Sequence, residues 1–169
     1  MAGIKVRESL EPMQNPPLVT CVTPTADRRE FIPYCVAQFL KQDYPNLEWV
    51  VVDNGADSVI DLIPIEGPRV RYYRITEKET HGALMNDCFA WAQGEIVIVH
   101  DDDDWYSSDR VSRQVQPFLD RPSTMLTGTG RLYYWVWGTE EVYQYRNLTE
   151  HLWLGAFAVR KSVWEQHKF

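Results

Sequence analysis

The sequence has 169 residues, of which 44% are hydrophobic. A chain of this length and composition can bury one hydrophobic core, but it is too short for two well-packed domains. Its 17 basic and 24 acidic residues give a net charge of −7, which argues against a nucleic-acid backbone or an anionic membrane as the main partner. Cys21, Cys35 and Cys88 lack CxxC spacing, so neither a disulfide framework nor a zinc site is expected. No leader and no apolar run of about 18 residues is visible, and we expect a cytoplasmic protein without a membrane span.

The hydrophobic pattern predicts a loose lead-in over residues 1–17 and then a single domain over 18–169. In chain order we expect a strand over 18–23, a helix over 29–42, strands over 47–53 and 69–75, a helix over 82–93 and a strand over 95–100. There follow a serine-capped helix over 107–119, a strand within 124–130, a hairpin over 131–145, a strand over 152–159 and a helix over 161–167. This alternation predicts an α/β fold with a mostly parallel central sheet and helices on both faces.

Polar side chains gather where the predicted parallel strands end. In such sheets the ligand lies beyond the carboxyl ends of the strands, so these side chains should converge in space. They are Thr23, Thr25, Asp27 and Arg28 after the first strand, Asp53 and Asn54 after the second, and Asp101–Asp104 after the fourth. Their convergence predicts a binding cleft at this edge of the sheet.

The stretch "IVIVHDDDDWY", residues 96–106, places four aspartates directly after an apolar strand. Clustered carboxylates suit hard cations such as Mg²⁺, Mn²⁺ or Ca²⁺. A calcium-binding loop is excluded, because Tyr106 and Ser112 stand where its glycine and glutamate would be. A cation shared with a diphosphate fits better, since phosphate oxygens and waters then fill its coordination shell.

Asp53 ends a different strand and has two interpretations. Its carboxylate could accept a hydrogen bond from a ring N–H of a nucleobase, or it could cap the turn at Asn54-Gly55. From its position alone, the turn cap is the better interpretation.

Four segments of the chain resemble a known family in their order and spacing. They read "VTPTADRREFI", "LEWVVVDNGAD", "HGALMNDCFAWAQGEIVIVHDDDDWYSSDRV" and "GAFAVRKSVW", and together they cover about residues 18–165. They resemble the nucleotide-sugar domain of family 2 glycosyltransferases, which has the GT-A fold, a Rossmann-like α/β sandwich. The resemblance implies transfer of a sugar from a UDP-sugar, with Mn²⁺ or Mg²⁺ and with inversion at the anomeric carbon, to a carbohydrate or other hydroxyl acceptor.

The acidic run provides the most specific part of the resemblance. Asp101 and Asp103 match the family's Asp-x-Asp pair, which implies that both belong to the metal site and that Asp103 binds the metal directly during catalysis. Asp101 or Asp102 would reach the ribose or a metal-bound water, and Asp104 is an extra acid outside the pair.

Other positions match the family's nucleotide-binding residues. Thr23, Pro24 and Thr25 match the turn that holds base and ribose, with Asp27 and Arg28 after it, and Asp53, beside Asn54, matches the acid that reads uracil. The resemblance thus reverses the preference for a turn cap at Asp53. Gly82 and Asn86 match a helix start near the diphosphate, with Met85 where the family often has a basic residue.

The general base of the family usually lies in an acidic motif beyond the segment that resembles 155–164, and this sequence ends at Phe169. Either the domain is minimal or truncated, without the usual C-terminal extension, or another acid acts as the base. Glu150 is our candidate for the base, although a glutamate at such a position is more often an exposed loop residue without a catalytic role. His151 could equally be buried or face the acceptor. Without a strong base we expect weak transfer or slow donor hydrolysis.

Two other functions stay open at this point. The domain could hold a nucleotide sugar without transferring it, or it could be a nucleotidyltransferase, although no Gly-rich basic loop follows the first strand. A cluster of aromatic residues could be a sugar platform, but core or hairpin packing is the more ordinary interpretation. The cluster comprises Tyr133, Tyr134, Trp135 and Trp137.

Overall fold

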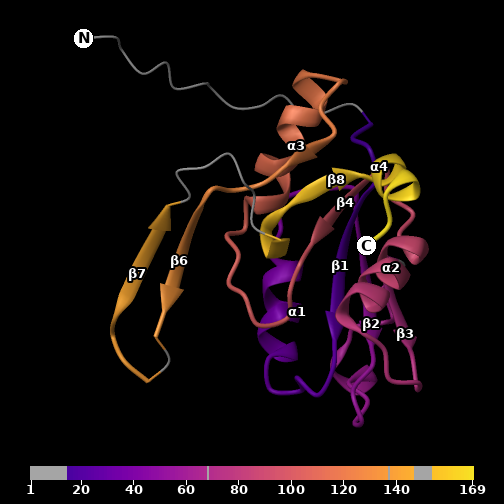
Figure 1. The fold of residues 1–169 in the computed structure, drawn as a ribbon, viewed down its shortest axis with the longest axis vertical. Helices are drawn as coiled ribbons and strands as arrows, with labels where there is room; N and C mark the ends of the chain where they lie inside the picture. The colour runs from indigo at the N-terminus through magenta and orange to yellow at the C-terminus, as the bar shows by residue number, and fades with distance from the viewer. Residues whose placement is uncertain (1–14, 68, 137, 147–153) are drawn as a thin grey trace.

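The computed structural model describes residues 15–67, 69–136, 138–146 and 154–169, and its centre is a six-stranded sheet (Figure 1). The strand order is β3-β2-β1-β4-β8-β5. The first four strands are parallel, whereas β8 runs antiparallel to β4 and β5. Their bounds are β1 Val19–Thr25, β2 Leu47–Asp53, β3 Val70–Arg74, β4 Ile96–Val99, β5 Leu126–Thr127 and β8 Ala158–Arg160. The predicted α/β fold with a mostly parallel sheet is confirmed.

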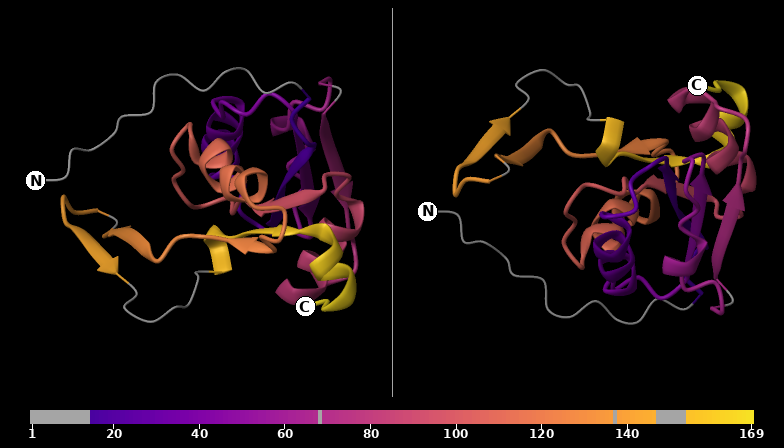
Figure 2. Two further views of the ribbon diagram at one scale, coloured as in Figure 1. Left: turned by 90° about the horizontal axis from the view of Figure 1, so that it is seen from above. Right: turned by 90° about the horizontal axis from the view of Figure 1, so that it is seen from below.

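Helices cover both faces of this sheet (Figures 1 and 2). The helices α1 (Ile32–Leu40) and α3 (Arg110–Asp120) pack on one face, and α2 (His81–Trp91) and α4 (Lys161–Gln166) pack on the other. Because neighbouring strand residues point to opposite faces, the buried apolar residues of β1, β2 and β4 supply both layers of the core. This arrangement explains why these three strands show no alternation of polar and apolar residues.

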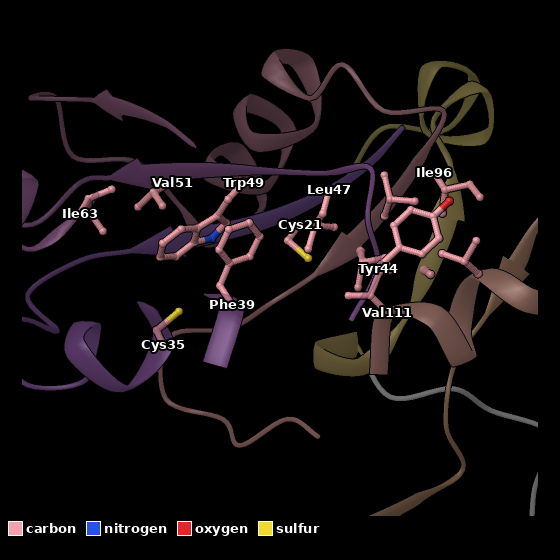
Figure 3. Close-up of a cluster of buried hydrophobic side chains, with 14 of the residues drawn as sticks. Cys21, Cys35, Phe39, Tyr44, Leu47, Trp49, Val51, Ile63, Ile96 and Val111 are labelled. Atoms are coloured by element: carbon pink, nitrogen blue, oxygen red, sulfur yellow. The ribbon is translucent and has the colours of Figure 1, made fainter. Parts of the chain in front are cut away.

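The core under α1 is built around a pair of stacked aromatic rings (Figure 3). Phe39 of α1 and Trp49 of β2 lie 4.8 Å apart between ring centroids.

The three cysteines are free and buried. Burial raises the pKa of the Cys21 thiol to about 12, so this thiol stays protonated and unreactive.

Several predicted boundaries differ from the structure. The predicted helix over 29–42 begins only at Ile32, next to Pro33. The predicted helix over 107–119 begins at Arg110, because the residues before it form a turn that ends in the N-cap Asp109. In the predicted strand over 152–159, the described part forms a short 3-10 helix, η2 (Leu154–Ala156), before β8. A second 3-10 helix, η1, spans Ile60–Leu62.

The predicted hairpin is present as β6 (Arg131–Trp135) and β7 (Val142–Arg146), a separate two-stranded sheet. It stands to one side of the central sheet in every view (Figures 1 and 2). Tyr133 and Trp135 are 64% and 59% exposed, so core packing is wrong for these two aromatics. Trp137 lies outside the described residues.

Candidate functional site

A cavity of about 310 Å³ opens at the carboxyl ends of β1 and β4. These two strands are adjacent in the sheet, which brings together residues about 75 positions apart in the sequence. The cavity is lined by Pro24, Thr25, Ala26, Arg28, His81, Leu84, Asp101, Asp102 and Asp103. Six of these nine are site residues that the sequence predicted, and the convergence expected at this edge of the sheet is therefore observed for the first and fourth strands.

The acidic loop, residues 101–104, is tied to the end of β1 by two side-chain contacts. The Thr25 hydroxyl donates to the buried Asp102 carboxylate at 2.5 Å. Arg28 Nη1 forms an ion pair with Asp103 Oδ2 at 2.5 Å, on the more exposed side of the loop. Thr23 points elsewhere: its hydroxyl donates to the His100 carbonyl and accepts from Trp49 Nε1, so this predicted site residue serves the core.

Three carboxyl groups of the acidic loop, those of Asp101, Asp102 and Asp104, resist ionisation in this environment. Burial, and then the charges of Asp104, Asp103 and Asp102, raise the pKa of Asp101 to about 6. Burial also raises the pKa of Asp102 and of Asp104. The loop therefore holds more negative charge than its protein surroundings neutralise.

A hard divalent cation fits this donor set, because it prefers carboxylate oxygens and would offset their mutual repulsion. Among the described residues, no three His, Cys, Asp or Glu side chains are arranged as a complete metal site. Asp101 and Asp103 would therefore hold the cation only together with oxygens from another source, such as a diphosphate and water. The shared-cation site at Asp101 and Asp103 therefore stays a prediction.

The Asp53 carboxylate is fully buried and has four partners among the described residues. Oδ1 accepts from the Gly55 N–H, and Oδ2 accepts from the Val59 N–H and the Tyr72 hydroxyl and pairs with Arg74 at 2.8 Å. These contacts are those of the turn cap that its position alone suggested. Contact between Asp53 and uracil stays a prediction. The carboxylate has no exposed surface, so this contact would require the protein around it to move.

Asn54 and Asp27 hold the neighbouring loops together and do not line the cavity. The Asn54 amide donates to the carbonyls of Ile75 and Glu77. Asp27, in the left-handed region at φ 54°, accepts from the Ala56 N–H at 2.6 Å. Their predicted contacts with the nucleotide remain predictions.

The start of α2 approaches the cavity, but the predicted Asn86 does not reach it. Its amide donates to the Phe169 carbonyl at 2.9 Å and accepts from Trp164 Nε1 at 2.9 Å, which ties α2 to α4. Gly82 has no neighbour within 4 Å of the position that a Cβ would take, so the first turn of α2 is open to a ligand. Met85 is buried in the core, which accounts for the absence of a basic residue there.

Comparison with known proteins identifies the family. The sequence model for Glycosyl transferase family 2 matches residues 20–164. The chain belongs to glycosyl transferase family 2. No helix among the described residues is both long and apolar enough to span a bilayer.

Members and neighbours of this family differ widely in sequence from the chain. The protein y4gI of Sinorhizobium fredii is 36% identical over 133 residues, which cover 75% of this chain and 14% of that protein. Glycosyltransferase GlyG of Streptococcus pneumoniae is 24% identical over 135 residues, 73% of this chain and 45% of its own length. The chain thus spans less than half the length of these two relatives.

Solved structures share the GT-A fold. The mannosyltransferase PcManGT of Pyrobaculum calidifontis, in complex with GDP-Man and Mn²⁺, aligns with a TM-score of 0.71 at 20% identity, over 94% of this chain and 51% of that one. TarS 1-349 of S. aureus, in complex with UDP-GlcNAc, aligns with a TM-score of 0.70 at 16% identity, over 88% and 47%.

Some residues of the cavity were missed by sequence reasoning. His81 directly precedes the predicted Gly82 and could have been found as the first residue of a helix that points at the cleft. Leu84 and Ala26 carry no chemical signal that would mark them. Glu150 and His151 lie outside the described residues, so the candidate base stays a prediction.

Proposed function

We propose that the cavity at the ends of β1 and β4 binds a UDP-sugar together with Mn²⁺ or Mg²⁺, and that the sugar is transferred with inversion to a hydroxyl acceptor. The observation that carries this proposal is the meeting of Asp101, Asp102 and Asp103 with Arg28 in one cavity of a family 2 glycosyltransferase. Two of these acids, Asp101 and Asp103, suit the cation, and the guanidinium suits a phosphate.

The charged residues of the cavity, and Thr25, each have a task in this proposal. Asp103, the proposed catalytic ligand, and Asp101 hold the cation, which when bound neutralises the departing diphosphate. Asp102 is held by the Thr25 hydroxyl through one oxygen, which leaves its second oxygen for a ribose hydroxyl. When the cation binds the Asp103 carboxylate, Arg28 leaves its ion pair with Asp103 and pairs with a phosphate oxygen of the donor.

The choice of UDP is supported by a fold neighbour in complex with UDP-GlcNAc, although another neighbour is in complex with GDP-Man. In our proposal the ring N–H of uracil donates to Asp53 Oδ1, which accepts one hydrogen bond from the described residues, that of the Gly55 N–H. Because Asp53 is fully buried, this contact requires the loop over residues 54–59 to open.

The acceptor side of the proposal depends on Glu150 as the general base. General-base catalysis contributes about 10²–10⁴-fold, so a poorly placed base would leave slow transfer, with water competing as the acceptor. Turnover of Glu150→Gln, measured alongside donor affinity, tests this role: fast transfer that survives the substitution would place the base elsewhere.

The test of the function is an incubation with UDP-glucose, UDP-GlcNAc and GDP-mannose, each with and without Mn²⁺, followed by assay of free sugar and nucleoside diphosphate. Release of UDP that requires Mn²⁺ and is lost in Asp103→Asn supports the proposal. The control is Asp61→Asn, which removes a carboxylate that is also paired with an arginine, Arg29, but lies outside the cavity. Tight Mn²⁺-dependent binding without turnover would favour a binding module. A parallel incubation with UTP and a sugar phosphate tests the third function, because release of pyrophosphate there would indicate a nucleotidyltransferase.

A further inference from the structure

The hydroxyl of Tyr106 touches three groups around the acidic loop. It accepts a hydrogen bond from the Asp101 N–H at 3.0 Å, and it lies 3.3 Å from Asp104 Oδ2 and 3.2 Å from the Gly155 carbonyl oxygen, to either of which it can donate. One phenol oxygen thus links the first and last residues of the loop to η2, far away in the sequence. Tyr106 itself does not line the cavity.

The ring of Tyr106 is held from the protein interior. The guanidinium carbon of Arg110 lies 3.9 Å from the ring centroid, and the buried His100 ring lies at 4.5 Å. Arg110 is itself buried and donates to the carbonyl of Val99, the last residue of β4, at 2.6 Å. A planar guanidinium that stacks on the ring and is anchored to a central strand fixes where the phenol oxygen can be.

A second support comes from α1. The Gln38 amide donates to the Asp104 carbonyl at 3.0 Å and accepts from the Tyr106 N–H, so one side chain holds the backbone on both sides of Trp105. Tyr106 therefore has both its backbone and its ring anchored, while its oxygen reaches back to the start of the loop. The four adjacent carboxylates repel one another, and without such anchoring their loop would relax toward solvent.

We propose that Tyr106 is a positioning residue for the acidic loop: its hydroxyl, braced by Arg110, holds Asp101 and Asp104 in the geometry that binds the cation and the donor. This inference rests on the proposed function for its consequence, but the mechanical part of it can be measured without any ligand. Tyr106 touches the loop and not the substrate, so its effect reaches the reaction only through the carboxylates.

The decisive variant is Tyr106→Phe, which keeps the ring and removes one oxygen. The matched control is Tyr44→Phe, because the Tyr44 hydroxyl donates a hydrogen bond to the Pro17 carbonyl at 2.9 Å, away from the cavity. Hydrogen exchange of the metal-free proteins should show amides 101–105 exchanging at least tenfold faster in Tyr106→Phe and unchanged in Tyr44→Phe. Unchanged exchange of the loop in Tyr106→Phe would overturn the inference, whatever the protein binds.

The second readout is the affinity for Mn²⁺ in the presence of UDP, measured by titration calorimetry. We expect this affinity to fall about five- to tenfold in Tyr106→Phe, which is the effect of one hydrogen bond. In turnover assays, kcat should recover at saturating Mn²⁺, while the apparent KM for Mn²⁺ stays raised. An equal loss of affinity in Tyr44→Phe, or a kcat that saturating Mn²⁺ does not restore, would mean a general structural role and overturn the inference. Absence of Mn²⁺-dependent UDP binding in the wild type would refute the proposed function instead, and the exchange result would still decide the role of Tyr106.

Discussion

Replacing Asp101 by asparagine should stabilise the metal-free protein at neutral pH. The folded-state pKa of Asp101, about 6 against an ordinary 3.8, means that the folded protein penalises its charge. A group whose folded-state pKa is raised adds stability at low pH, and this contribution is lost as the pH rises from about 4 to 6. The difference between the two pKa values corresponds to about 3 kcal/mol at most. Among the described residues none donates a hydrogen bond to this carboxylate, so asparagine breaks no such contact.

The assay is a thermal melt of wild type and Asp101→Asn in EDTA at pH 7.5 and pH 4.5. For a chain of this size, up to about 3 kcal/mol corresponds to a rise in Tm of up to about 6–12 °C at pH 7.5. The difference should shrink at pH 4.5, where wild-type Asp101 is already protonated. Asp61→Asn is the control of opposite sign, because Arg29 lowers the pKa of Asp61 and its charge is favourable. A Tm difference that is the same at both pH values, or a lower Tm for Asp101→Asn at pH 7.5, would refute the reasoning.

Four further predictions concern the acidic loop, its neighbour Gly155 and the buried Asp53. Asp103→Asn should abolish Mn²⁺-dependent binding of UDP in titration calorimetry, whereas Asp104→Asn should weaken it less; equal affinity of Asp103→Asn and wild type at saturating Mn²⁺ would sink the metal assignment. Asp53→Asn should cost about 3 kcal/mol of stability by urea unfolding, because it removes the charge of a fully buried carboxylate that pairs with Arg74. Wild type should bind UDP about tenfold more tightly than CDP; equal binding of the two would remove the uracil role. Gly155→Ala should weaken donor binding about tenfold, because its Cβ would lie 2.5 Å from a carboxylate oxygen of the acidic loop; unchanged affinity would show that the loop tolerates displacement.

The fold could be predicted because its signals are local. Apolar residues at both odd and even positions of β1, β2 and β4 predicted a sheet covered on both faces, and the positions of α1 and α2 followed from their apolar spacing. The ends of elements were less accurate where a turn preceded the helix, as before Arg110. The direction of β8 could not be read from its three residues, because only pairing with its neighbours decides between parallel and antiparallel.

The candidate site was predicted by a rule about sheets rather than by contacts. Residues after parallel strands share an edge, and this placed Arg28 near the acidic loop across 75 positions of sequence. The same rule placed Asp53 and Asn54 at that edge, but it could not say that their side chains would be used by neighbouring loops. The place of a residue at the end of a strand predicts where it lies in the sheet, but it does not predict which group its side chain will contact.

The sequence by itself therefore determined the class of fold, the family, and the place where negative charge would gather, because periodicity and motif spacing are properties of the chain alone. Only the tertiary structure decided which polar groups face the cavity and which are satisfied inside the protein. Asn86 is held by residues near 164–169, and Tyr106 reaches Gly155 across 49 positions. Such partners are chosen by packing in three dimensions, where a hydrogen bond depends on distances of a few tenths of an ångström that no spacing in the sequence encodes.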